Sequence, residues 1–151
     1  MYKIVITLVI VTSTLFGGLK PNKKDYSSFD SIPTETLAKE MAYEMAKGVR
    51  LPMKLDEVTQ LVNIYNFHTT IFFKKSIDIE NKKIKPLWEK HQKELIQYML
   101  KNDTQNICYN PVWQYMIFKR GIIPEFNYVS LNNKPLFRYT IEVEDCNKLK
   151  K

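Results

Sequence analysis

Apolar residues recur along this chain at two spacings, which separate the predicted helices from the predicted strands. Near the start of the chain they repeat at every fourth position: Leu37, Met41, Met45 and Val49. Such positions lie one helical turn apart and form one stripe. Pro33 and Thr34 are typical of a helix start. We therefore predict a helix over residues 33–50, with its methionine stripe packed in a core.

Two further helices are predicted in the middle of the chain. The first begins at Pro86, carries an apolar stripe from Leu87 to Leu100, and ends at Asn102 and Asp103.

The second of these helices is shorter and has clear boundaries. Asn110 is a good N-cap, Pro111 suits the first helical position, and Gly121 suits the residue just after a helix. Trp113 and Ile117 supply apolar anchors, so this helix also packs on a core.

Four segments are rich in β-branched and aromatic residues or alternate apolar with polar residues, as strands do. They form two predicted hairpins: residues 59–65 with 69–76, and residues 125–131 with 136–143. The chain therefore predicts a single α+β domain with the element order αββααββ. We expect a four-stranded antiparallel sheet with the helices on one face. Tyr128 and Tyr139 are expected to be exposed on the last hairpin, where they would suit a protein-binding face.

The first 18 residues have the layout of a secretory signal peptide. A short basic start leads into an apolar run over residues 4–16, with Gly17 and Gly18 at its exit. The run is shorter than the about 20 residues that span a bilayer. The cleavage site is imperfect, so an uncleaved membrane anchor stays an alternative.

The rest of the chain divides into three parts. Residues 19–32 are polar and without periodicity, which predicts a flexible linker. We place the α+β domain at residues 33–147 and a basic tail at residues 148–151.

Cys108 and Cys146 are the two cysteines of the chain. In an oxidising compartment two lone cysteines usually pair. Their spacing fits neither a zinc site nor a C-x-x-C redox motif. We predict one structural disulfide, with a metal or redox role as the alternative.

The net charge of +7 suggests an anionic partner. The chain has only three arginines, and nucleic-acid readers rely on arginine forks, which argues against a nucleic-acid partner. Lysines at the exit of the first hairpin form a candidate patch for an anionic envelope surface, an acidic glycan or an acidic protein. This lysine patch consists of Lys74, Lys75, Lys82, Lys83 and Lys85. A solvated loop is the alternative.

No catalytic, cofactor or metal site is predicted. His68 and His91 have no cysteine or carboxylate at metal-ligand spacing. Asp56 and Glu57 are adjacent at a strand entrance, where a capped turn explains them better than an acid–base pair does. Two of the four glycines lie in the leader, so no glycine-rich phosphate loop can be built.

Several motifs resemble a broad group of small exported bacterial proteins. The motifs are Pro52 with Asp56 and Thr59 before the first strand, Cys108 with Pro111 at the short helix, Gly121 after it, and the terminal Cys146. The group includes quorum-sensing-regulated virulence factors, and its fold is similar to that of certain secretion-system pilotins. The resemblance covers about residues 35–146 and implies an envelope location, with helices packed on an antiparallel sheet. Lipid-anchored pilotins carry a cysteine right after the leader, and this chain has none.

We therefore expect an exported, non-enzymatic accessory protein of the bacterial envelope, periplasmic or secreted, that binds a protein partner in secretion or virulence. No cofactor is expected. Two alternatives stay open: a small-ligand-binding protein or hydrolase whose site is not visible in the sequence, and a membrane-tethered envelope protein.

Overall fold

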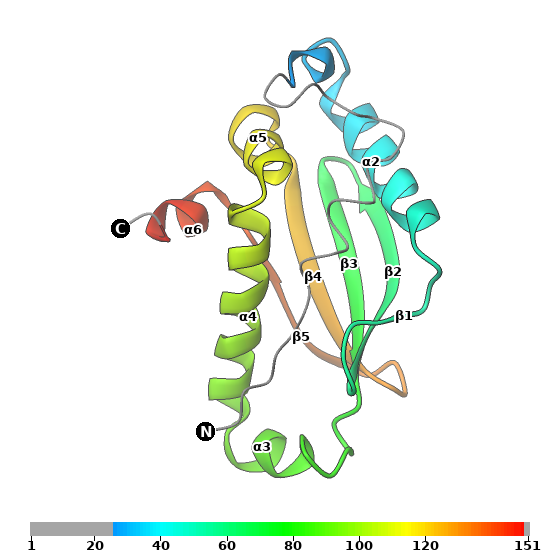
Figure 1. Cartoon of the computed structure of the whole chain (residues 1–151), viewed down its shortest axis with the longest axis vertical. Helices are drawn as coiled ribbons and strands as arrows, with labels where there is room; N and C mark the ends of the chain where they lie inside the picture. The colour runs from blue at the N-terminus through cyan, green and yellow to red at the C-terminus, as the bar shows by residue number, and fades with distance from the viewer. Residues whose placement is uncertain (1–25, 150–151) are drawn as a thin grey trace.

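A five-stranded sheet with helices packed on one face makes up residues 26–149, the part of the chain that this computed structural model describes (Figure 1). The predicted signal peptide and residues 19–25 of the predicted linker lie outside the described residues. The strands are β1 (Met53–Lys54), β2 (Thr59–Phe67), β3 (Thr70–Ile77), β4 (Ile123–Ser130) and β5 (Pro135–Thr140). The helices are the 3-10 turn η1 (Ser27–Phe29), α2 (Thr34–Gly48), α3 (Lys85–Lys90), α4 (Gln92–Cys108), α5 (Pro111–Arg120) and α6 (Val143–Lys148).

The single α+β domain is confirmed, but the sheet differs from the prediction. Its order is β1-β2-β3-β4-β5, and β3 pairs with β4 in parallel, whereas every other pair is antiparallel. The prediction of a four-stranded antiparallel sheet is therefore wrong, because the sheet is mixed and has a fifth strand. Both predicted hairpins are present, but hairpin patterns do not fix the direction in which two hairpins meet. A helical connection as long as residues 78–122 allows a parallel pairing.

The helix boundaries in the middle of the chain also differ from the predictions. One predicted helix is divided in two, and its second part continues past the predicted end. A break at His91 separates α3 from α4. Helix α4 then continues through Asp103 to Cys108, since Asp103 points inward to an ion pair and Thr104 donates a hydrogen bond to the Leu100 carbonyl at 2.7 Å.

The last predicted strand is shorter than expected. Strand β5 ends at Thr140, and α6 begins at Val143. A capping box accounts for this change: the Glu142 side chain accepts from the backbone of Asp145, and the Asp145 side chain accepts from the backbone of Glu142.

Side chains from the inner face of the sheet contact all three long helices. Lys75 on β3 reaches Asp103 on α4, and the rings of Phe73 and Trp113 on α5 make a T-shaped contact at a centroid distance of 5.9 Å. Leu37 and Met41 on α2 are fully buried in the same core, as the predicted methionine stripe requires. All three helices therefore cover one face, and the other face carries no described helix.

The end of the predicted linker packs on the domain. Phe29 is buried, and Arg120 donates hydrogen bonds to the carbonyl oxygens of Phe29 and Ile32. Asp30 accepts a hydrogen bond from the Tyr115 hydroxyl. Residues 26–32 are thus tied to α5.

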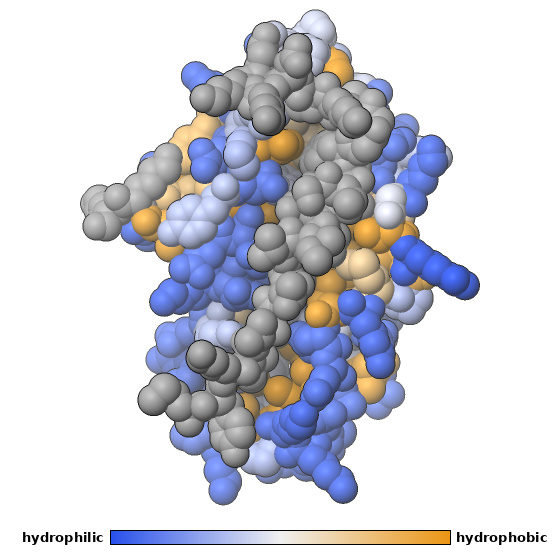
Figure 2. Space-filling view, viewed as in Figure 1, coloured by the Kyte–Doolittle hydropathy of each residue, from blue (hydrophilic) through white to orange (hydrophobic). Residues whose placement is uncertain are grey.

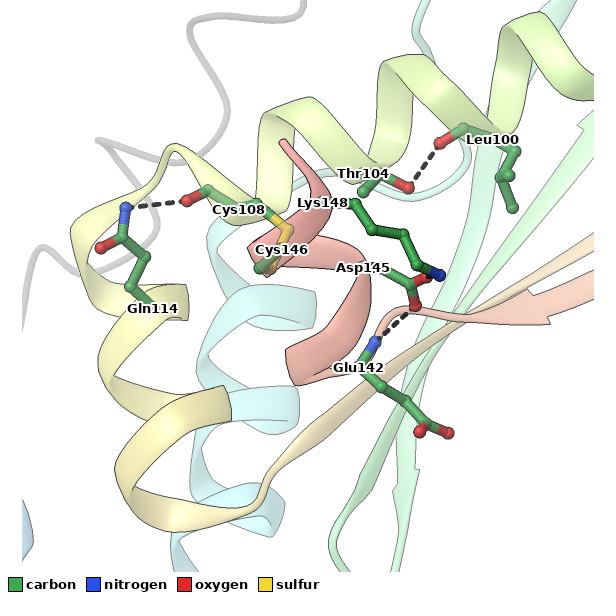
Figure 3. Close-up of a disulfide and its surroundings, with 8 residues drawn as sticks. All are labelled: Leu100, Thr104, Cys108, Gln114, Glu142, Asp145, Cys146 and Lys148. Atoms are coloured by element: carbon green, nitrogen blue, oxygen red, sulfur yellow. Dashed lines mark hydrogen bonds and ion pairs between the residues drawn. A yellow bond between two sulfur atoms is a disulfide. The ribbon is translucent and has the colours of Figure 1, made fainter. Parts of the chain in front are cut away.

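Cys108 and Cys146 form a disulfide with a Cα–Cα distance of 5.2 Å (Figure 3). Cys108 ends α4 and Cys146 lies in α6, so the bond fastens the C-terminal helix beside α4. The Gln114 side chain donates to the Cys108 carbonyl at 2.8 Å and links α5 to the same point. Within residues 26–149, no helix combines the length and apolar character needed to cross a bilayer.

Candidate binding groove

A groove of about 500 Å³ opens on the helical face of the sheet. Its floor comes from the sheet, and its walls come from the end of α2, the β1 segment, α4 and the start of α5. Figure 1 shows β2, β3 and β4 between α4 on one side and α2 on the other. The apolar lining comprises Met45, Met53, Leu55, Leu61, Ile64, Phe73, Ile107, Pro111, Trp113 and Phe126.

The groove follows from the side-chain alternation of the strands. On β3, Phe73 and Lys75 both point to the helical face because alternate residues share a face. Phe126 on β4 is the partner of Phe73 in the register, and the two rings stack at a centroid distance of 5.1 Å. Figure 2 shows hydrophobic side chains, in orange, at the surface on this side of the molecule, with hydrophilic ones around them. Exposed apolar surface in a concave site is typical of a binding region.

A buried ion pair forms part of the groove lining. Lys75 and Asp103 are only 5% and 2% exposed, and the Lys75 Nζ lies 2.7 Å from the Asp103 Oδ1. Tyr128 and Tyr139 donate their hydroxyl hydrogens to the other carboxylate oxygen, Oδ2, at 2.7 and 2.5 Å. Asp103 thereby accepts three hydrogen bonds, which compensates for the loss of its hydration.

The lysine of this pair has further partners. Its ammonium donates to the Tyr128 hydroxyl at 3.2 Å and lies 4.6 Å from the centre of the Phe126 ring. Such a position over a ring stabilises a buried cation. We call Lys75, Asp103, Tyr128 and Tyr139 the buried cluster.

Burial and the neighbouring carboxylate change the acidity of both tyrosines. Loss of solvation, followed by the negative charge of Asp103, raises the pKa of Tyr128 well above its usual value. The same two causes, in the same order, raise the pKa of Tyr139. Both hydroxyls therefore stay protonated and act as donors to Asp103 at neutral pH.

The wall formed by α4 and the start of α5 adds polar groups to the groove. Gln105, Asn106 and Asn110 line this side. Asn110 caps α5 as predicted, because its Oδ1 accepts from the backbone N–H groups of Val112 and Trp113 at 2.9 and 3.2 Å. The Asn106 Nδ2 atom is buried and has no hydrogen-bond partner within residues 26–149. The groove thus combines an apolar floor with one polar edge.

The predicted lysine patch is not one surface. Lys75 is buried and belongs to the helical face, because its charge is satisfied by Asp103. Lys74, the next residue, points to the opposite face of the sheet. Lys83 pairs with Glu57, and Lys85 pairs with Glu80 at 2.6 Å. Lys82 is exposed on the connecting loop.

The tyrosines expected on an exposed face are instead on the covered face. Tyr128 is 3% exposed, and the side chain of Tyr139 is half-buried against α4. Both residues look like surface residues in the sequence because tyrosine suits either setting. The hydrogen bonds that both hydroxyls donate to Asp103 place these tyrosines in the interior and not on the surface.

The remaining candidate residues form no reactive cluster among the described residues. His68 is exposed in the β2–β3 turn, with its Nδ1 atom 3.0 Å from Glu35, and His91 is exposed between α3 and α4. The Asp56 side chain accepts from the backbone N–H groups of Val58 and Thr59, so it caps a turn. No group of three or more metal-ligating side chains occurs within residues 26–149.

The buried cluster left a weak signal in the sequence. Lys75 stands at an apolar-face position of β3, between Phe73 and Ile77, and Asp103 lies one turn after Met99 on the stripe of α4. A lysine and an aspartate that each interrupt an apolar stripe are candidates for a buried pair, since buried charges need partners. The groove has no comparable signal, because it depends on how α2 and α4 are spaced on the sheet.

Comparison with known proteins identifies the fold. No protein family matches the chain by sequence, and no curated protein does. Among solved structures, the pilotin EpsS of the Vibrio vulnificus type 2 secretion system is similar, with a TM-score of 0.61 and 12% identity over 75% of this chain and 91% of the pilotin. The type II secretion system pilotin AspS of Vibrio cholerae has a TM-score of 0.57 and 14% identity over 75% of this chain and 92% of that one. At these identities the likeness concerns the fold alone, and this chain has a pilotin-like fold.

Proposed function

We propose that this protein is a non-enzymatic accessory component of a bacterial secretion machinery, and that the groove binds an apolar segment of a protein partner in that machinery. The groove on the helical face is the observation that carries the proposal. The fold supports it, because the similar structures EpsS and AspS are named as pilotins of type 2 secretion systems.

The chemistry of the groove fits a polypeptide segment with one apolar side. Apolar side chains of the segment can contact the floor through Leu61, Ile64, Phe73 and Phe126. The polar side of the segment can contact Gln105 on α4. Burial of apolar side chains in such a groove supplies affinity at about 25 cal/mol per Å² of surface removed from water.

The groove offers little to a hydrolase. Neither His68 nor His91 lines it, and the lysine and aspartate that do are already paired with each other. A catalytic base needs a free lone pair within reach of a substrate. The non-enzymatic role is therefore the better fit to the groove.

We also propose an envelope location, periplasmic or secreted. The predicted leader and the Cys108–Cys146 disulfide support it, because disulfides persist in oxidising compartments. Regulation by quorum sensing and a role in virulence are proposals that rest only on the resemblance in the sequence. Membrane attachment depends on whether the leader is retained.

Site-specific photo-crosslinking tests the groove. A photoreactive phenylalanine analogue replaces Met53, which lines the groove and is half-buried, and the variant is expressed in the native host. The matched control carries the same analogue at Leu131, which is 57% exposed in the β4–β5 turn and does not line the groove.

We expect position 53 to give a defined product that contains a secretion-machinery protein, identified by mass spectrometry, and position 131 to give none. Equal products at both positions, or a product at position 53 without any secretion component, would contradict the proposal.

A further inference from the structure

The face of the sheet opposite the groove presents its own row of polar side chains. Lys75 and Tyr128 point toward α4, so their chain neighbours Lys74 and Asn127 point away from it. In the register, Asn127 is the partner of both Lys74 and Arg138, and Lys74 is also the partner of Asn63. Directly paired residues share a face. Four strands therefore bring Asn63, Lys74, Asn127 and Arg138 into one line, which we call the donor row.

All four members of the donor row can offer N–H groups. Lysine and arginine are donors only, and asparagine has both a donor and an acceptor. The acceptor of Asn63 is already used, because its Oδ1 takes the backbone N–H of Ile64 at 2.9 Å. Its amide N–H₂ group is thus the part left for a ligand. The row is a set of donors that crosses the strands at right angles.

The charges of the donor row are not neutralised by neighbours. Within residues 26–149, neither Lys74 nor Arg138 makes an ion pair. Arg138 is exposed and Lys74 is half-exposed. Both cations therefore face solvent on a surface that no described helix covers.

The charges are also spaced. Lys74 and Arg138 lie two strands apart, which is about 10 Å, with the neutral Asn127 between them. The neighbouring row on the same face holds Tyr65, Phe72 and Glu125. Tyr65 stacks on Phe72 at a centroid distance of 4.9 Å, and Tyr65 is 41% exposed. The donor row is thus bordered by an apolar strip and by a single carboxylate.

We propose that this open face binds an acidic polysaccharide in which carboxylate-bearing sugars alternate with neutral sugars. The two cations meet successive carboxylates, and the Asn127 amide donates to a hydroxyl or carbonyl oxygen between them. The Asn63 amide donates to the sugar on the other side of Lys74. The aromatic strip packs against the apolar faces of the sugars. This surface lies on the opposite side of the sheet from the groove and does not depend on the function proposed for the groove.

Charge spacing separates this ligand from other polyanions. A nucleic acid carries a phosphate at every unit, and two cations about 10 Å apart cannot match that charge density. A lipid surface calls for clusters of four or more lysines or arginines, and the donor row has two cations. An acidic peptide matches the charges but has no apolar sugar faces for Tyr65 and Phe72.

Titration with hyaluronan oligosaccharides, which alternate glucuronate with N-acetylglucosamine, tests the proposal. The ¹⁵N-labelled chain is titrated at low salt, and both the affinity and the shifted resonances are recorded. Chito-oligosaccharides, which lack the carboxylate, serve as the neutral control probe. Poly-glutamate, a single-stranded DNA and phosphatidylglycerol vesicles represent the other anions.

The test variant is Lys74→Gln with Arg138→Gln. The matched control is Lys93→Gln with Lys101→Gln, which removes the same charge from exposed positions on α4. If the first pair impairs folding, Asn127→Asp places a carboxylate between the two cations, with Asn147→Asp on α6 as its control.

We expect hyaluronan to shift resonances of the donor row, and its affinity to fall about tenfold or more in the Lys74/Arg138 variant and to stay within about twofold in the control. Asn127→Asp should weaken binding, and Asn147→Asp should not. Three results would overturn the proposal: no binding at low salt, equal losses in both variant pairs, or tighter binding of poly-glutamate, DNA or vesicles than of hyaluronan.

Discussion

At the scale of the residue, Asp103 shows how one carboxylate can organise an interior. It accepts hydrogen bonds from Lys75, Tyr128 and Tyr139, which come from three different strands. A polar group in this position would be costly without partners, because its hydration is lost on folding. Its three donors turn it into a link between α4 and the sheet.

Removal of Asp103 should therefore destabilise the protein more than its own contacts suggest. We expect Asp103→Leu to lower the free energy of unfolding by about 3–5 kcal/mol, since Lys75 would keep a buried charge without a counter-ion. The double variant Lys75→Met/Asp103→Leu should recover part of this loss. Urea unfolding of Lys75→Met, Asp103→Leu and the double variant measures the coupling free energy between the two charges. Additive losses would show that the two charges do not depend on each other.

The two tyrosines of the buried cluster should affect stability at high pH. Burial raises the pKa of each above the value near 10 that it has in the unfolded chain. The stabilisation that these two hydroxyls contribute is then complete below about pH 10. It is lost as the pH rises further, because tyrosines in the unfolded chain ionise at lower pH than these two do in the folded protein. The loss should reach about 1.4 kcal/mol per pH unit for each tyrosine.

Unfolding in urea between pH 9 and 11 measures this slope. The variant Tyr128→Phe/Tyr139→Phe should lose stability less steeply than the natural chain, whatever its stability at neutral pH. Parallel curves for the two proteins would mean that these tyrosines ionise equally in the folded and unfolded states.

At the scale of the element, the disulfide holds a short helix that would otherwise have little support. Helix α6 has six residues, and Cys146 is its buried residue. Isolated helices of this length are not stable in water, so tertiary contacts must maintain it. The bond to Cys108 supplies such a contact and joins α6 to the end of α4.

Loss of this bond should lower stability by a few kcal/mol. The chain-entropy relation gives about 4 kcal/mol for a loop with a sequence separation of 38 residues. We expect the variant Cys108→Ser/Cys146→Ser to show this loss in urea unfolding, together with faster amide exchange in residues 143–148. Mass spectrometry without reductant should find the natural bond within one chain. A free thiol in the natural chain, or unchanged stability in the variant, would contradict the prediction.

The elements also show which sequence signals are decisive. Asn110, Pro111 and Gly121 define α5 almost to the residue, because each meets a local backbone requirement: Gly121 has a φ of +63°. Helix α4 passes its predicted end at Asn102 and Asp103 because Lys75 stabilises the aspartate from another element. Local patterns therefore predict boundaries where the cause is local, and they fail where a distant partner supplies it.

At the scale of the whole molecule, the two hairpins and the one-sided helical layer could be predicted, but their assembly could not. The parallel contact between β3 and β4 arises where two distant hairpins meet, and neither hairpin encodes its direction. The groove and the donor row depend on this contact, since both include residues from each side of it. The candidate sites were therefore invisible in the sequence, although most of their residues lie on predicted elements.

The origin of the buried cluster has a consequence for assembly. Lys75 comes from the first hairpin, whereas Asp103, Tyr128 and Tyr139 all follow it by 28 residues or more. The first hairpin alone can form its backbone ladder but cannot neutralise its inward lysine. Any docking of the two halves in a shifted register would trap that cation in an apolar interior without an anion. The Lys75–Asp103 pair therefore favours the one register of the two halves of the chain in which both buried charges are neutralised.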